Sequence, residues 1–457
     1  MFVSWTYTFR GTASRLSGRA WLSVGLALLL AAPAAVPSLA QSADEQSRLE
    51  ELEREVRRLR QELQAATGSV SGTRIDELER KLEVLAEELQ RLRGREVEAV
   101  AGTDEAGIVP GGMAPAVSQV YRQERGVSVG GYGEVLYQSF DDATEAGDPS
   151  GKTDELDMKR LITYFGYKFN DWILFNSEIE YEHANTSAEG EVEVELAYLD
   201  FLLNPRFNLR AGMFLVPVGF INELHEPPIF LGARRPLVER NIVPTTWAEV
   251  GVGVYGESGR VTYRGYLGSS LDAAGFSSSS GLRGGRQKGS KARAEDLALT
   301  GRVDVDAAPG LLVGGSLFTG GTGQGRSDPT SGQPIDGTVT MWDLHAEYRH
   351  RGWQARALWV DVDLDDAALI SELVGEPVGS AMEGYYVEAG YDVLATRGTD
   401  HELIPYARFE SYDTLAELPG DSAGTGRETD VTTIGVAYKP IPQVVIKADH
   451  QSLDNEA

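Results

Sequence analysis

One stretch of the sequence, residues 215–248, gathers charged side chains of both signs. Its acids are Glu223, Glu226 and Glu239, and its arginines are Arg234, Arg235 and Arg240. If this stretch is a loop folded into a channel, it sets the width of the channel, and its charges set the ion preference. Equal numbers of acids and bases favour a transverse field, which orients dipolar solutes, over a filter of one sign. Each arginine could instead form a salt bridge that pins the loop to a wall.

Two other basic groups could act with this stretch. Arg206 and Arg210 are expected on one face of a strand near 206–214, where they would add positive potential beside the loop. The segment 283–293 carries five basic residues among glycines and serines. It could gather anions at a channel mouth, bind lipid phosphates, or simply be a solvated loop tip.

The residues needed for other kinds of chemistry are missing or unfavourably spaced. The chain has no cysteine, which excludes disulfides, a thiolate nucleophile and Cys-ligated metals. Its six histidines lie in no nucleophile motif and lack the paired spacing of a metalloprotease. We therefore expect no enzyme, no cofactor and no metal site. The formal net charge of −27 argues against binding to nucleic acid.

From residue 127 onward the sequence changes to a period of two, which predicts β-strands. Within 342–349, for example, Asp343 and His345 alternate with Leu344. We predict fifteen strands between 127 and 451. The connections after even-numbered strands are short, and those after odd-numbered strands are mostly long. This parity is typical of an outer-membrane barrel with short periplasmic turns.

The predicted fold class is therefore all-β, an antiparallel transmembrane β-barrel of about sixteen strands over residues 127–457. Bacterial single-chain barrels have even strand numbers. Either a sixteenth strand is missing after the polar end of strand fifteen, or the count is wrong in 127–169 or 363–394, where the alternation is poor. Sixteen strands would leave an aqueous channel.

Three other segments precede the barrel. Residues 1–40 have the three-part pattern of a secretory signal peptide, although an internal start codon remains an alternative. Residues 41–98 place leucines at heptad spacing and predict a periplasmic coiled coil, either oligomeric or folded back as a hairpin. Residues 99–126 are rich in Gly, Ala, Pro and Val and predict a flexible linker.

Residues 208–219, with the sequence NLRAGMFLVPVG, resemble the strand-to-third-loop segment of the phosphate-selective porin O and P family. The stretch that follows, through Gly256, is also similar to that family. The resemblance covers roughly 127–457 and implies a sixteen-stranded, homotrimeric outer-membrane channel. In the family, arginines at the constriction and a ladder of lysines draw anions. Here the barrel lysines are scattered, and the strands near 172–183 and 191–203 bring glutamates instead.

These observations predict a passive outer-membrane porin for small hydrophilic solutes and ions. The resemblance implies phosphate or other anions as permeants, whereas the acidic composition of the barrel would favour cations. The expected partners are outer-membrane lipid and two further copies of the chain. The alternative is a structural outer-membrane protein whose coiled coil tethers the membrane to peptidoglycan.

Overall fold

The computed structural model describes residues 114–455 except 145–146, 185, 187–189, 421 and 424–427. The strands are β1 (Gly126–Gln138), β2 (Glu155–Lys168), β3 (Ile173–Glu182), β4 (Val192–Asn204), β5 (Phe207–Leu215), β6 (Ala248–Ser258), β7 (Val261–Ser269), β8 (Leu297–Ala308), β9 (Leu311–Gly321), β10 (Thr338–His350), β11 (Trp353–Leu364), β12 (Ala381–Tyr391), β13 (Glu402–Leu418), β14 (Ser422–Ala423), β15 (Thr429–Ile441) and β16 (Val444–Asn455). The helical segments are η2 (Gln119–Arg122), η3 (Pro227–Ile229), α4 (Val238–Asn241), η4 (Ala273–Gly275), η5 (Arg283–Gly285) and α5 (Ala367–Val374). In this described part of the chain, none of the helices has the length and apolar character of a membrane span. The predicted signal peptide and coiled coil lie outside the described residues.

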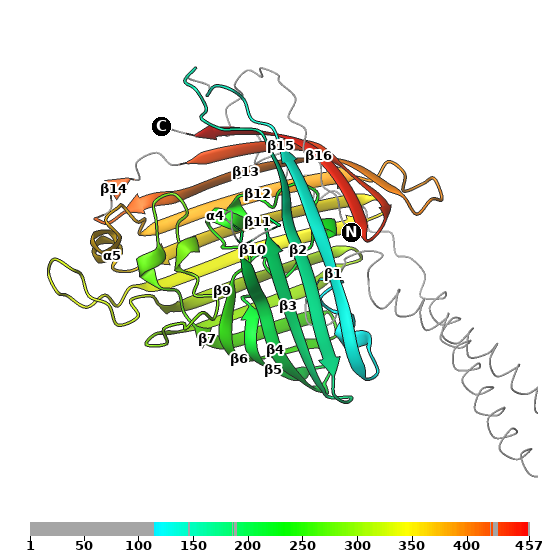
Figure 1. The fold of residues 1–457 in the computed structure, drawn as a ribbon, viewed down its shortest axis with the longest axis horizontal. Helices are drawn as coiled ribbons and strands as arrows, with labels where there is room; N and C mark the ends of the chain where they lie inside the picture. The colour runs from blue at the N-terminus through cyan, green and yellow to red at the C-terminus, as the bar shows by residue number, and fades with distance from the viewer. Residues whose placement is uncertain are drawn as a thin grey trace, which may run out of the picture. The chain divides into compact units, whose positions relative to one another are not determined.

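The strands form one antiparallel meander in which each long strand pairs with the next along the chain (Figure 1). The two-residue strand β14 pairs with β13 beside this path. The fifteen predicted strands and the alternation of short and long connections are confirmed. With fifteen strands in the path, β1 and β16 run in the same direction, so they cannot form an antiparallel ladder. Among the described residues no ladder joins them, and a closed sixteen-stranded barrel is not shown.

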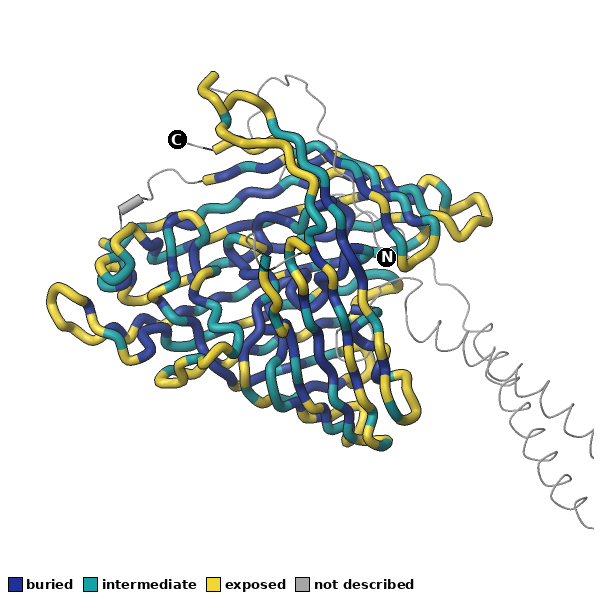
Figure 2. Tube along the Cα trace, in the orientation of Figure 1, coloured by how far each residue is buried: buried dark blue, intermediate teal, exposed yellow. Residues whose placement is uncertain are grey.

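The two faces of the sheet differ in polarity. The outer, exposed face is apolar and the inner, buried face is polar, which is the reverse of the arrangement in a soluble protein. In β10, Leu344 is 55% exposed, whereas Asp343 and His345 on the other face are 1% and 4% exposed. Buried and exposed positions alternate in this way along the strands (Figure 2). The exposed large hydrophobic residues include Val129, Leu161, Phe165, Val252, Leu267, Leu299, Leu317, Trp359 and Ile434. An apolar outer face and a polar inner face are the pattern of a transmembrane barrel.

The connection between β5 and β6, residues 216–247, lies inside the curved sheet, and we call it the inner loop. It is held by strands from the middle and from the far end of the meander. Its partners are Arg264 of β7, Asp343 of β10, Tyr386 of β12, Glu410 of β13 and Asp449 and Lys447 of β16. A loop that starts at β5 can contact β16 only if the sheet curls around it. The inner loop therefore occupies the lumen.

The inner loop also supplies much of the apolar core. Val218, Phe220 and Ile221 are 0% exposed and belong to the main buried cluster. The turn between the first two of these needs glycine, because Gly219 has a φ of +68°. A Cβ at Gly219 would also lie 2.6 Å from Oε2 of Glu239. The buried apolar core of this fold therefore lies in the lumen, around the inner loop.

Of the linker predicted over 99–126, residues 99–113 lie outside the described residues. Residues 114–120 do not extend freely, because Ala114, Val117 and Val120 are 1%, 3% and 1% exposed and pack in the core. Asn176 of β3 donates a hydrogen bond to the carbonyl of Val117. The small and apolar residues that suggested a linker instead fit against the inner face of the sheet.

Candidate functional site

Arginines on the inner face of the sheet are paired with carboxylates. The pairs are Arg160 with Glu134 and Glu180, Arg210 with Asp200, Arg264 with Glu223 and Asp304, Arg302 with Asp304, Arg356 with Glu347, and Arg408 with Glu388 and Glu410. All of these side chains are buried. A buried charge is tolerated when a partner offsets its desolvation. These wall arginines are therefore balanced by neighbouring acids.

Arg210 lies on the inner face of the sheet, where the carboxylate of Asp200 offsets its charge. Its Nε and Nη2 atoms donate to the two carboxylate oxygens of Asp200 at 2.8 and 2.9 Å. Its guanidinium carbon also lies 3.9 Å from the ring centroid of Tyr198. The register of β4 against β5 places Arg210 directly opposite Asp200.

Arg206 does not belong to the site. It precedes β5 in the turn that follows β4, and it is exposed. Its backbone N–H donates to the side chain of Asn204, which fixes the turn. The strand begins one residue later than predicted, so Arg206 does not share the inner face with Arg210.

The three acids of the inner loop are buried and act as anchors. Glu223 forms an ion pair with Arg264 at 2.7 Å. Glu226 accepts the backbone N–H groups of Ala116 and Val117 at 2.8 and 3.1 Å. Burial raises the pKa of Glu226 to about 7, although these two hydrogen bonds oppose the shift. The predicted transverse field needs the acids of this loop to face the channel, whereas all three are buried and engaged by neighbouring groups.

Glu239 has two hydrogen-bond partners, and both are buried. Its carboxylate accepts the N–H of Ile221 at 2.5 Å and the hydroxyl of Tyr386 at 2.6 Å, and its exposed fraction is 0%. Burial raises the pKa of Glu239, and the two hydrogen bonds act in the opposite direction. One carboxylate thus ties two parts of the inner loop to β12.

We expect Tyr386→Phe to loosen this attachment. Removing the hydroxyl takes one hydrogen-bond donor away from the buried carboxylate of Glu239, which lowers the stability of the protein by about 1–3 kcal/mol. The unfolding temperature should fall and single-channel conductance should rise, because the loop is less firmly held. Tyr391→Phe on the opposite face of the same strand is the control and should change neither quantity. Equal behaviour of the two variants would contradict the anchoring role.

The arginines of the inner loop keep contact with solvent. Of residues 216–247, those that are not buried are Pro228, Arg234, Arg235, Arg240, Asn241 and Thr246. Arg234 donates to the side chain of Gln138 on β1, and Arg235 donates to the carbonyl of His225. These acceptors are neutral, and the described residues provide no ion pair for Arg234, Arg235 or Arg240. The charges that this loop presents to solvent are therefore all positive.

Arg283, from the connection between β7 and β8, joins this positive region. Its Nη1 atom donates to the carbonyl and hydroxyl of Thr245 at 3.3 and 3.2 Å. Burial, followed by the charges of Arg286, Arg240 and Arg235, lowers the pKa of Arg283. The charges of these three arginines act on Arg283 in the same direction as burial, which shows that they lie near it. We call Arg234, Arg235, Arg240 and Arg283 the arginine cluster.

The basic segment 283–293 is not a solvated tip throughout. Arg286 donates to the carbonyl of Thr246 at 3.1 Å, and Lys288 pairs with Glu193 of β4 at 2.5 Å. The sequence showed the basic residues of this segment. It gave no signal that they would reach the inner loop, because the contact depends on how two long connections fold.

No family model matches this chain. An uncharacterized protein of Aquifex aeolicus is 39% identical over 354 residues, which are 74% of this chain and 78% of that protein. The chain belongs to the family of this Aquifex aeolicus protein.

Several solved structures are similar at low identity. A loop-deletion mutant of OmpT, an outer membrane protein of Vibrio cholerae, is 12% identical with a TM-score of 0.46, over 73% of this chain and 95% of that one. The outer membrane channel DcaP of Acinetobacter baumannii is 14% identical with a TM-score of 0.41, over 72% and 92%. OmpF of Salmonella typhi is 10% identical with a TM-score of 0.46, over 70% and 88%. The antiparallel strand pairing of the chain itself defines its fold.

Proposed function

We propose that this protein is a passive outer-membrane porin whose inner loop forms a narrow, anion-attracting constriction. Small hydrophilic solutes would cross the lumen down their gradients. The observation that carries the anion preference is the charge of the accessible loop residues, which are arginines without a carboxylate partner among the described residues. Acids are abundant in the lumen, but those of the inner loop are buried and engaged.

The apolar outer face supports the membrane location, and the enclosed loop supports the constriction. Because most of the inner loop is buried, the free cross-section beside it is small, and we expect low single-channel conductance. A guanidinium binds phosphate through two parallel hydrogen bonds, which makes phosphate a suitable permeant for the arginine cluster. The resemblance of residues 208–219 to the phosphate-selective porins points the same way.

The test is the zero-current potential of the purified full-length protein in a lipid bilayer under a KCl gradient. We expect the sign of an anion-selective pore, and we expect added phosphate to reduce the chloride current. A cation-selective or near-zero potential without a phosphate effect would indicate a general porin in which the acids prevail. No conductance at all would contradict the channel function.

We also propose that the protein assembles as a homotrimer and that residues 41–98 attach it to the cell wall. The resemblance implies a homotrimer in outer-membrane lipid, with residues 41–98 in the periplasm, which chemical cross-linking in membranes would detect. Deleting 41–98 tests whether this segment contacts peptidoglycan. Unchanged conductance with reduced retention by isolated cell walls would support a tether in addition to the channel.

A further inference from the structure

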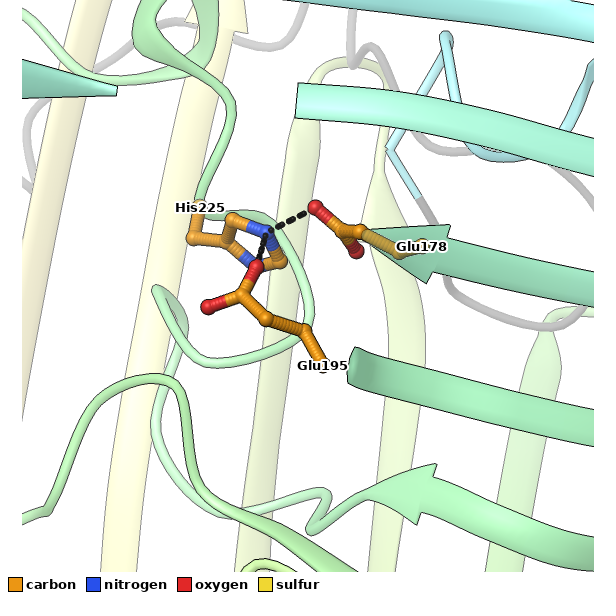
Figure 3. Close-up of side chains that lie close together, drawn as sticks. All are labelled: Glu178, Glu195 and His225. Atoms are coloured by element: carbon orange, nitrogen blue, oxygen red, sulfur yellow. Dashed lines mark hydrogen bonds and ion pairs between the residues drawn. The ribbon is translucent and has the colours of Figure 1, made fainter. Parts of the chain in front are cut away.

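Three potential metal ligands converge where the inner loop meets β3 and β4 (Figure 3). They are His225 of the inner loop, Glu178 of β3 and Glu195 of β4, and their ligand atoms all lie within 4.8 Å of one another. The Nε2 atom of His225 is 3.1 Å from Oε1 of Glu178 and 3.5 Å from Oε2 of Glu195. The exposed fractions of the three side chains are 2%, 0% and 2%. The site is therefore buried and contributed by three separate elements.

The ring of His225 is oriented as a metal ligand would be. Its Nδ1 atom lies 2.9 Å from the backbone carbonyl of Asn222, to which it donates a hydrogen bond. A histidine that binds a metal usually donates its other ring N–H to a carbonyl or carboxylate, which fixes the tautomer. Here that arrangement leaves Nε2 directed at the two carboxylates.

The carboxylates themselves supply an independent sign of a missing partner. Both oxygens of Glu195 and Oε2 of Glu178 are buried and make no hydrogen bond of ordinary geometry among the described residues, and the groups that face Glu195 are the His225 ring and the carboxyl of Glu180. The hydroxyl of Tyr164, which feels the charge of Glu178, is also buried without a hydrogen-bond partner there. Buried polar atoms are rarely left unsatisfied, and each one costs about 1–3 kcal/mol. Several such atoms around one point indicate a ligand.

We propose that Glu178, Glu195 and His225 bind a divalent first-row transition metal, for which Zn²⁺ is the probe. Around a tetrahedral ion with ligands at about 2.0–2.2 Å, neighbouring ligand atoms are about 3.3–3.6 Å apart. The two separations from Nε2 lie close to that range. Two carboxylates and a neutral imidazole balance the charge of a dication, and imidazole with carboxylate suits metals such as Zn²⁺. The bound ion would fasten the inner loop to β3 and β4 and leave a fourth position for water.

The competing state is an imidazolium between two carboxylates. Burial lowers the pKa of His225, but the neighbouring carboxylates of Glu178 and Glu195 more than offset it and raise the pKa to about 10 without a metal. Proton and metal compete for Nε2. Direct metal binding decides between the two states.

The experiment is calorimetric titration of Zn²⁺ into the full-length protein, purified in detergent and stripped with a chelator. We expect one equivalent per chain, and at least about tenfold weaker binding in Glu195→Gln and in His225→Gln. His345→Gln is the matched control. His345 also lies between two carboxylates, but Asp343 and Asp304 occupy one ring nitrogen each, so no nitrogen is directed at both acids. Its replacement should leave Zn²⁺ binding unchanged.

Wild-type protein that binds no Zn²⁺, or that binds it no better than Glu195→Gln, would overturn the proposal and establish the ion pair. Because a variant could fail to fold, Co²⁺ added to the wild-type protein gives a second measurement. A visible absorption band of tetrahedral Co²⁺ is expected, and its absence would also overturn the proposal. Both readouts measure binding in the absence of transport, so they are independent of the proposed channel activity.

Discussion

Replacing both Arg234 and Arg235 by glutamine is expected to abolish the anion preference of the channel. These two side chains are partly accessible to solvent, donate to neutral acceptors and form no ion pair with a carboxylate among the described residues. A unit charge about 8 Å from a permeating ion, at an effective dielectric constant of about 40, contributes about 1 kcal/mol. Losing two such charges should lower the anion-to-cation permeability ratio at least about tenfold at low salt, and less at high salt.

The measurement is the zero-current potential of the double variant under the same KCl gradient as the wild type. Arg326→Gln is the matched control, because Arg326 pairs with Asp272 at 2.6 Å in the outer connections. The control should retain the wild-type potential. A double variant with unchanged selectivity would show that the arginine cluster does not lie on the ion path.

The second large effect concerns Arg210, and it is an effect on stability. Arg210→Met should lower the free energy of unfolding by about 3–5 kcal/mol, because it leaves Asp200 buried without its counter-charge. Asp200 is 0% exposed, so water cannot take over the role of the guanidinium. Unfolding in urea, followed in detergent, would measure the loss.

Two further variants identify the cause of this loss. Arg206→Met, in the exposed turn beside the same strand, should stay within about 0.5 kcal/mol of the wild type. Arg210→Met combined with Asp200→Leu should recover part of the stability. The recovery is incomplete because Tyr121 and Tyr255 both donate hydrogen bonds to Asp200. The paired replacement should also leave the zero-current potential unchanged, and a shift would show that the pair does contribute to selectivity.

The strand architecture could be predicted from the sequence because its signals are local. In a strand with one face toward lipid and the other toward the lumen, apolar and polar side chains alternate along the sequence. Asp343, Leu344 and His345 show this alternation. Turn residues mark the boundaries, so each predicted strand is present. The position of the inner loop could likewise be anticipated, since 216–247 is the longest connection and is rich in charge.

The tertiary structure decided which arginines have a carboxylate partner and which do not. Arg210 and Arg234 are the same residue type, but the register of β4 and β5 brings Asp200 to Arg210, and the path of the inner loop brings neutral groups to Arg234. The convergence of Glu178, Glu195 and His225 likewise needs two strands and a loop to meet. The sequence by itself determined the strands and the charged loop, because both depend on neighbours along the chain. The pairing of charges depends on which distant residues meet across the lumen, and only the folded chain brings them together.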